Sequence, residues 1–181
     1  MSVLVAYASR HGATQGIAER IAERLRSHGL DAEARPAGKI RDVAAYDAVV
    51  VGSAAYMFHL LGDATRFIER NLAALVARPV WLFSSGPLGT HAIDDKGREV
   101  LVTSEPKEFA GLRTSLRPRG TRVFFGAWDP AAPPKGVTER LVRLMPGVPP
   151  MPGGDFRDWQ AIDAWADSIA AEMVPAPVAA G

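Results

Sequence analysis

Near its start the chain reads Val3-Leu4-Val5-Ala6-Tyr7-Ala8-Ser9-Arg10-His11-Gly12-Ala13-Thr14, and this stretch decides the fold. Its first half, up to Ala8, is a continuous apolar run, which is typical of a strand buried on both faces. Its second half is a loop of small and polar residues, and an amphipathic helical segment starts at Thr14 or Gln15. Backbone N–H groups at the start of such a helix bind anions. The stretch therefore predicts a phosphate site between the first strand and the first helix.

The composition of this loop excludes the two best-known phosphate loops. It lacks G-x-x-x-x-G-K-[ST], which argues against a Mg-nucleotide hydrolase, and it lacks the dinucleotide fingerprint G-x-G-x-x-G. Without a lysine and a metal-binding acid, the loop would hold phosphate by backbone N–H groups and by the hydroxyls of Ser9 and Thr14. Such a site suits a phosphate that is retained rather than transferred. The alternative, a loop that only caps the first helix, stays open.

Strand and helix patterns alternate along the rest of the chain. The predicted strands are 3–8, 31–35, 47–52, 80–83 and 122–127. The predicted helices run from the first loop to near Gly29, across 67–76, from about Pro106 to Leu116, and across 159–173 after a cap at Asp155 or Asp158. This alternation predicts an α/β fold with a doubly wound parallel sheet, and the half-polar second strand belongs at its edge.

Three loops follow the first, third and fourth predicted strands, at 9–14, 53–60 and 84–90. Because ligands of such sheets bind at the carboxyl ends of the strands, we expect these loops to converge. Their small residues let the backbone approach a planar ligand, and Tyr56, Met57 or Phe58 can cover its face. The three loops therefore predict one binding site.

The composition of the chain narrows the function classes. A length of 181 residues suits one domain, and a net charge of +1 argues against a nucleic-acid partner. The absence of cysteine excludes disulfides and thiolate chemistry, and no apolar run reaches the ~20 residues of a membrane span. No His/Asp/Glu cluster has metal-ligand spacing, and no G-x-S-x-G elbow is present. We therefore expect a cytoplasmic protein without a transmembrane segment and without a metal.

Three stretches resemble one known family. Tyr7 to Thr14, Val49 to Met57 and Gly154 to Trp159 are similar to the flavodoxin-like FMN proteins grouped with menaquinone-dependent protoporphyrinogen dehydrogenase. The first loop has the S-x-x-G-x-T form of that group rather than the T-x-T-G-x-T form of electron-carrier flavodoxins. The resemblance covers most of residues 1–173 and implies strand order 2-1-3-4-5 and noncovalent FMN.

The resemblance also implies an FMN-binding site of sixteen residues on the three loops. They are Ser9, Arg10, His11, Gly12, Ala13 and Thr14 for the phosphate; Ser53, Ala54, Ala55, Tyr56 and Met57 for one side of the isoalloxazine ring; and Ser85, Gly86, Pro87, Leu88 and Gly89 for its other edge and the ribityl chain. FMN supplies the redox chemistry itself, so no catalytic side chain is required.

Several other side chains have two interpretations. His59 contacts the flavin edge or a substrate, or it lies at a helix start or on the surface. His91 contacts substrate, or it lies on the surface. Trp128 stacks near the flavin, or it anchors the segment that follows it. Asp94 and its neighbour Asp95 are expected in a solvated turn. The remaining tryptophans are expected in the core: Trp81, Trp159 and Trp165.

The stretch 128–154 is expected to be an insert within a single domain of residues 1–174. It holds seven of the fourteen prolines and is too long for an ordinary strand-to-helix loop of about 2–6 residues. Its basic and apolar part, 135–145, offers a peripheral membrane contact. The last stretch, 175–181, is expected to be a disordered tail.

Two functions from different classes remain open, and a third ranks below them. The first is an FMN-dependent oxidoreductase of tetrapyrrole (heme) metabolism, moving electrons between a small organic substrate, such as a porphyrinogen, and a quinone-like acceptor. The second is a flavodoxin-type electron carrier without a substrate of its own. Because such carriers tend to be strongly acidic, the net charge of +1 favours the enzyme. The third is a scaffold that has lost its flavin.

Overall fold

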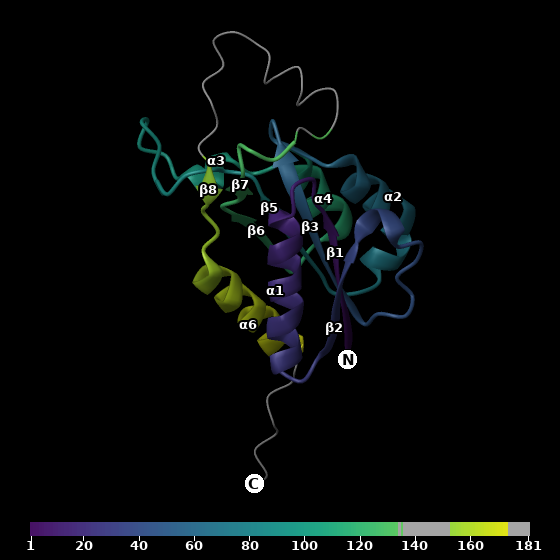
Figure 1. Cartoon of the computed structure of the whole chain (residues 1–181). Helices are drawn as coiled ribbons and strands as arrows, with labels where there is room; N and C mark the ends of the chain where they lie inside the picture. The colour runs from purple at the N-terminus through teal and green to yellow at the C-terminus, as the bar shows by residue number, and fades with distance from the viewer. Residues whose placement is uncertain (134, 136–152, 174–181) are drawn as a thin grey trace.

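Parallel strands form the centre of the fold, and helices cover both faces of the sheet (Figure 1). The structure, a computed structural model, describes residues 1–133, 135 and 153–173. The strand order is β2-β1-β3-β5-β6, and every neighbouring pair on this path is parallel. The strands are β1 (Ser2–Ala8), β2 (Asp31–Pro36), β3 (Ala48–Tyr56), β5 (Val80–Ser85) and β6 (Gly120–Phe124). Because β4 lies off this path, the order confirms the predicted 2-1-3-4-5 arrangement of the five main strands.

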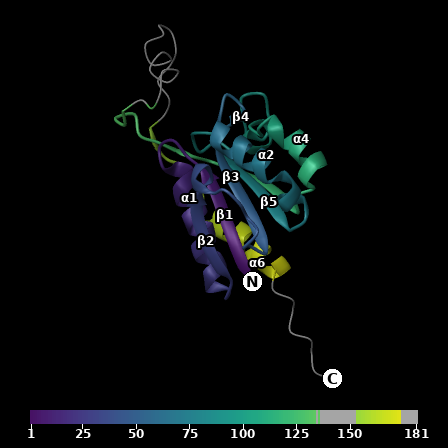
Figure 2. The same cartoon turned by 90° about the vertical axis from the view of Figure 1, so that its right-hand side faces the viewer.

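The helices form one layer on each side of this sheet (Figures 1 and 2). One layer holds α1 (Ala13–Ser27) and α6 (Trp159–Met173), and the other holds α2 (Gly62–Val76) and α4 (Glu108–Leu116). The short elements η1 (Ala37–Lys39) and α3 (Val100–Thr103) lie in the connections.

Strand β1 contributes to both hydrophobic cores, as its continuous apolar run predicted. Val3, Val5 and Tyr7 pack on the side of α1 and α6, whereas Leu4 and Ala6 pack on the side of α2 and α4. Burial on both faces fixes this strand in the interior of the sheet. The loop after it therefore stands at a fixed place, at the carboxyl edge.

Helices α1 and α4 begin one to two residues from their predicted starts, whereas α2 begins at Gly62, five residues before the predicted stretch 67–76. Helix α1 begins at Ala13, because Gly12 adopts a left-handed conformation with φ of +88° and turns the chain into the helix. At its other end, Gly29 has φ of +80°, as expected for a glycine that ends a helix. Helix α4 begins at Glu108 rather than near Pro106, because a tight turn precedes it, in which the Phe109 N–H donates to the Pro106 carbonyl.

The predicted loop 53–60 is largely strand, and this is the main correction to the fold. Strand β3 continues to Tyr56 and then pairs antiparallel with β4 (His59–Leu60). The two residues between them, Met57 and Phe58, have φ of 51° and 65°, the backbone of a type I′ hairpin turn. Pairing with β5 on one side and with β4 at the end keeps this stretch extended.

Trp159 corrects a second expectation, because its side chain is not in the core. It is 37% exposed, and the guanidinium of Arg157 lies over its ring at 4.4 Å from the centroid. Trp81 is buried as expected, and the partly buried Trp165 packs edge-on against Phe83 and Phe124.

The segment between β6 and α6 begins and ends in a short antiparallel pair. β7 (Ala127–Trp128) pairs with β8 (Gly154–Asp155). Of the two predicted caps of α6, Asp158 accepts from the Ala161 N–H, whereas Asp155 lies in β8. Most of the predicted insert and the whole predicted tail lie outside the described residues.

Candidate functional site

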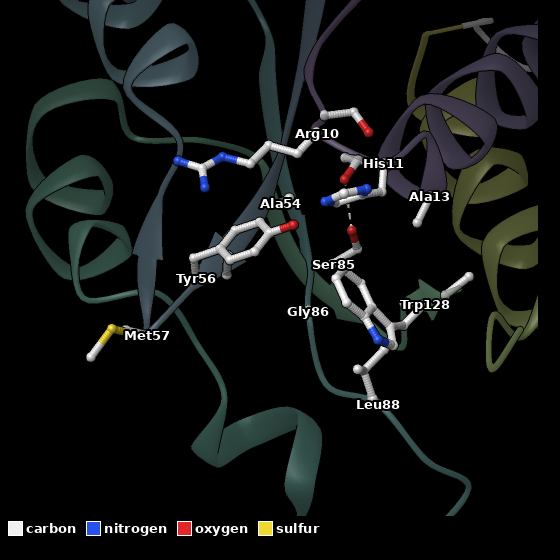
Figure 3. Close-up of a pocket in the computed structure, with 15 residues that line it drawn as sticks. Arg10, His11, Ala13, Ala54, Tyr56, Met57, Ser85, Gly86, Leu88 and Trp128 are labelled. Carbon is white, nitrogen blue, oxygen red and sulfur yellow. Dashed lines mark hydrogen bonds between the residues drawn. The ribbon is translucent and has the colours of Figure 1, made fainter. Parts of the chain in front are cut away.

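A pocket of about 400 Å³ opens at the carboxyl ends of β1, β3 and β5 (Figure 3). Its lining comes from the three predicted loops and from a fourth stretch after β6. The lining residues are Ser9, Arg10, His11, Ala13, Thr14, Ala54, Ala55, Tyr56, Met57, Ser85, Gly86, Leu88, Gly126, Ala127 and Trp128. A volume of this size lies within the usual range of cofactor pockets, about 300–1,000 Å³.

The first loop aims the start of α1 at this pocket. The Gly12 N–H donates to the Ser9 hydroxyl at 3.1 Å, which closes the loop, and the helix ladder starts with the Gly16 N–H on the Gly12 carbonyl. By helix geometry the N–H groups of the first turn have no carbonyl partner within the helix. They are the donor set that an anion at the helix start requires.

A buried hydroxyl pair joins the first loop to the third. Thr14 Oγ1 and Ser85 Oγ are 2.9 Å apart, and both side chains are buried. Both residues also line the pocket. The pair holds the end of β5 against the start of α1, so the first and third loops together form the base of the pocket.

Two aromatic side chains form opposite walls of the pocket. The Arg10 guanidinium carbon lies 4.9 Å from the centroid of the Tyr56 ring. The His11 ring meets Trp128 edge-on, with 4.9 Å between the centroids. Consecutive residues of the first loop thus contact different walls, and Figure 3 shows their side chains pointing in different directions.

The hairpin that carries Tyr56 is held from outside by α4. His59 Nδ1 is 2.8 Å from Glu108 Oε1, the Leu60 N–H donates to Glu108 Oε2, and the Lys107 N–H donates to the Phe58 carbonyl. Burial acts to raise the pKa of Glu108, but the hydrogen bonds from His59 and from backbone N–H groups lower it overall. His59 therefore binds α4 and does not line the pocket.

Both ends of the segment after β6 contact the first loop. The ammonium of Lys135 donates to the Arg10 carbonyl, and Arg157 donates to the Ala13 carbonyl at 3.3 Å. Arg157 also forms two hydrogen bonds with Asp155, at 2.7 and 2.6 Å, and these lower the pKa of Asp155. Lys135 and Arg157, two described residues of this stretch, thus contact the chain where α1 begins.

Twelve of the sixteen residues expected at the FMN site line the pocket. The other four lie beside it: Gly12, Ser53, Pro87 and Gly89. The Ser53 hydroxyl is buried and accepts from the Leu61 N–H, so it holds β3 against the start of α2. The Pro87 carbonyl accepts from the Gly126 N–H, which joins the third loop to the fourth stretch.

Gly126 and Ala127 were missed by the sequence prediction, and Trp128 had two open interpretations. The signal that could have found them is a pair of small residues before a tryptophan, directly after a buried strand. His91 is exposed and outside the lining. Asp94 lies in a turn as expected: it accepts from the N–H groups of Arg98 and Lys96, and these bonds lower its pKa.

The described part of the chain offers neither a metal site nor a membrane-spanning helix. Within it, no group of three or more His, Cys, Asp or Glu side chains is placed to hold a metal ion. None of the helices described there has both the length and the apolar character needed to cross a membrane.

The comparisons with known proteins agree with this fold. A family model described as flavodoxin domain matches residues 4–131, more than half of the chain. Flavodoxin 1 from Bacillus cereus superposes with a TM-score of 0.59 at 13% identity, covering 97% of this chain and 100% of that one. Flavodoxin 2 from the same organism gives 0.58 at 18% identity, covering 96% and 100%. A Streptococcus pneumonia flavodoxin gives 0.57 at 16% identity, covering 95% and 99%. The search of curated proteins found no match.

The residues of the pocket fit FMN, the cofactor that this family match indicates. The start of α1, with the hydroxyls of Ser9 and Thr14, is a donor set for phosphate. The isoalloxazine ring of FMN needs a narrow apolar slot. The chain after β5 approaches β3 closely, since a Cβ on Gly86 would lie 2.9 Å from the Ala55 carbonyl oxygen. From its fold, its pocket and the family model together, the chain belongs to the flavodoxin-domain family, whose cofactor is FMN.

Proposed function

We propose that this protein is an FMN-dependent oxidoreductase that transfers electrons between a small organic substrate and a quinone-like acceptor. The observation that carries the proposal is the pocket lining, which combines a helix start, buried hydroxyls and two aromatic walls. The twelve lining residues named from the sequence, together with Gly126, Ala127 and Trp128, are its proposed cofactor contacts.

The residues of the chain bind and orient the cofactor, whereas FMN, when bound, supplies the electron-transfer chemistry. The first turn of α1 and the hydroxyls of Ser9 and Thr14 hold the phosphate. Tyr56 and Trp128 bound the ring site, and Leu88 keeps water from it. Met57 lines the pocket and is 81% exposed, so it is available to contact a substrate.

The net charge of the chain supports an enzyme rather than an electron carrier. Electron carriers use an acidic surface to steer basic partners, but this chain has a net charge of +1, and no Asp or Glu lines the described pocket. The finer proposal is an enzyme of the protoporphyrinogen dehydrogenase type, with a porphyrinogen as substrate. It would act in the cytoplasm as one domain, 1–174, whose insert 128–154 contacts the membrane surface.

A flavodoxin-type electron carrier is the second candidate. It is supported by the match to the flavodoxin-domain model and by neighbours that are themselves flavodoxins. In that case the exposed Met57 and Phe58 would contact a protein partner instead of a small substrate.

The visible absorption spectrum of the purified protein, with FMN titrated into any colourless fraction, is the first test. We expect a yellow protein that binds one FMN tightly and then reduces a water-soluble quinone at the expense of protoporphyrinogen. Tight FMN without turnover of either compound supports the carrier. A protein that binds no FMN at high micromolar concentration overturns both proposals.

A further inference from the structure

Arg10 and His11 are neighbours in the first loop, but they place their side chains at different ends of the pocket. The His11 ring contacts Trp128, whereas the Arg10 guanidinium lies over Tyr56. Figure 3 shows the Arg10 side chain extending across the pocket to the Tyr56 ring and away from Ala13 at the start of α1. Its charge therefore stands at the ring end of the site and not at the phosphate end.

The charge of the lining is positive. Arg10 is the lining residue that is protonated at every physiological pH, and the lining of this described pocket contains neither Asp nor Glu. The ammonium of Lys135 donates to the Arg10 carbonyl and adds a second positive charge nearby. A ligand that gains negative charge is stabilised in such surroundings.

Tyr56 holds the guanidinium in a fixed place. The ring belongs to the β3–β4 hairpin, which Glu108 and the Lys107 N–H fasten to α4. A planar guanidinium stacks well on an aromatic face. Fixing the guanidinium on a ring that is itself held in place costs less side-chain entropy than fixing it on a mobile partner. Both groups are half-buried, so solvent screens the charge only in part.

A flavin ring that takes up two electrons and one proton carries one negative charge that the oxidised ring lacks. A fixed cation beside the ring stabilises the reduced state more than the oxidised state. On the basis of the proposed FMN function, we propose that Arg10, supported by Tyr56, makes the pocket prefer reduced FMN and raises the potential of the bound flavin.

The test measures the dissociation constants of oxidised FMN and of dithionite-reduced FMN for the parent and its variants. We expect Arg10→Gln to lower the preference for reduced FMN by about tenfold, which corresponds to a midpoint potential about 30 mV lower for a two-electron couple. Arg10→Met provides a second neutral variant, and Arg10→Lys should retain most of the preference because it keeps the charge. Arg41→Gln, which removes an exposed arginine outside the pocket, is the matched control.

The affinities for oxidised and for reduced FMN distinguish a role of Arg10 at the flavin ring from a role at the phosphate. If Arg10→Gln weakens both redox states by the same factor, Arg10 serves the phosphate and the inference is overturned. Unchanged affinities for both states overturn it as well. If the parent binds neither state, the proposed function fails before Arg10 is tested.

Discussion

The imidazole of His11 meets the indole of Trp128 edge-on, with 4.9 Å between the ring centroids and 79° between the planes. This contact joins the loop after β1 to the residue that ends β7, and both side chains line the pocket. Trp128 itself is buried, so its ring serves as a pocket wall rather than as a surface group. The start of the stretch after β6, Gly126 to Trp128, is therefore part of the pocket.

Replacing Trp128 should weaken FMN binding. An aromatic contact contributes about 0.5–1.5 kcal/mol beyond its buried area, so Trp128→Leu should raise the FMN dissociation constant roughly two- to twelvefold. Fluorescence titration with FMN measures it. Trp159→Leu removes a tryptophan outside the pocket and should leave the constant unchanged. Equal constants for both variants and the parent would show that Trp128 only anchors the chain.

The buried hydroxyl pair predicts a difference between two replacements of Thr14. Thr14→Val leaves the Ser85 hydroxyl buried without its 2.9 Å partner, which should cost about 1–3 kcal/mol in the free energy of unfolding. Thr14→Ser keeps the hydroxyl and should cost less. Urea unfolding without FMN measures both.

Ser84 provides the matched control for this pair. Its hydroxyl is buried with no hydrogen-bond partner among the described residues, so Ser84→Ala should leave the stability unchanged or raise it. A loss of stability in Ser84→Ala as large as that in Thr14→Val would mean that the hydroxyl pair is not the cause.

Two glycines should respond to alanine in opposite directions. A Cβ on Gly52 would lie 2.0 Å from Cζ of the buried Phe83, so Gly52→Ala should lower the free energy of unfolding by about 3 kcal/mol. A Cβ on Gly111, inside α4, meets no atom within 4 Å, so Gly111→Ala should raise it by about 1 kcal/mol. Thermal unfolding of the two variants beside the parent checks both signs.

Ion pairs between α1 and α6 predict a dependence of stability on pH. Arg20 binds Asp163 and Arg24 binds Asp167, at 2.7 and 2.6 Å. Hydrogen bonds from Arg24 and then from His28 lower the pKa of Asp167 from 3.8 to about 2. Because the folded state has the lower pKa, this stabilisation is present above about pH 5 and disappears as the pH falls toward 2.

Asp167→Asn tests this dependence. The variant should be less stable than the parent at pH 7, and the difference should shrink between about pH 5 and pH 2. Glu69→Gln, on the exposed face of α2, should follow the parent at every pH. A difference for Asp167→Asn that stays constant with pH would assign the effect to packing. Urea unfolding at a series of pH values measures these curves.

The pattern of the sequence by itself determined the main strands and the meeting of the three loops, whereas the strand order came from the family resemblance. Val3 to Ala8 is apolar at every position, and this local pattern alone requires a strand buried on both faces. Chain direction then places Ser9, Tyr56 and Ser85 at the same edge, because parallel strands end together. The apolar run depends on near neighbours in the chain, and the shared edge follows from the parallel direction of the strands, so the sequence pattern predicts both.

The tertiary structure decided which side chains face the pocket. Residues 53–56 remain strand because β5 and β4 pair with them, and those partners are distant or follow later in the chain. Trp128 joins the lining because β7 brings it to His11, whereas Trp159 leaves the core because Arg157 covers it at the surface. His59 turns to Glu108 on α4. The contacts of Trp128 with His11, of His59 with Glu108 and of β3 with β5 join residues far apart in sequence, and periodicity carries no information about such contacts.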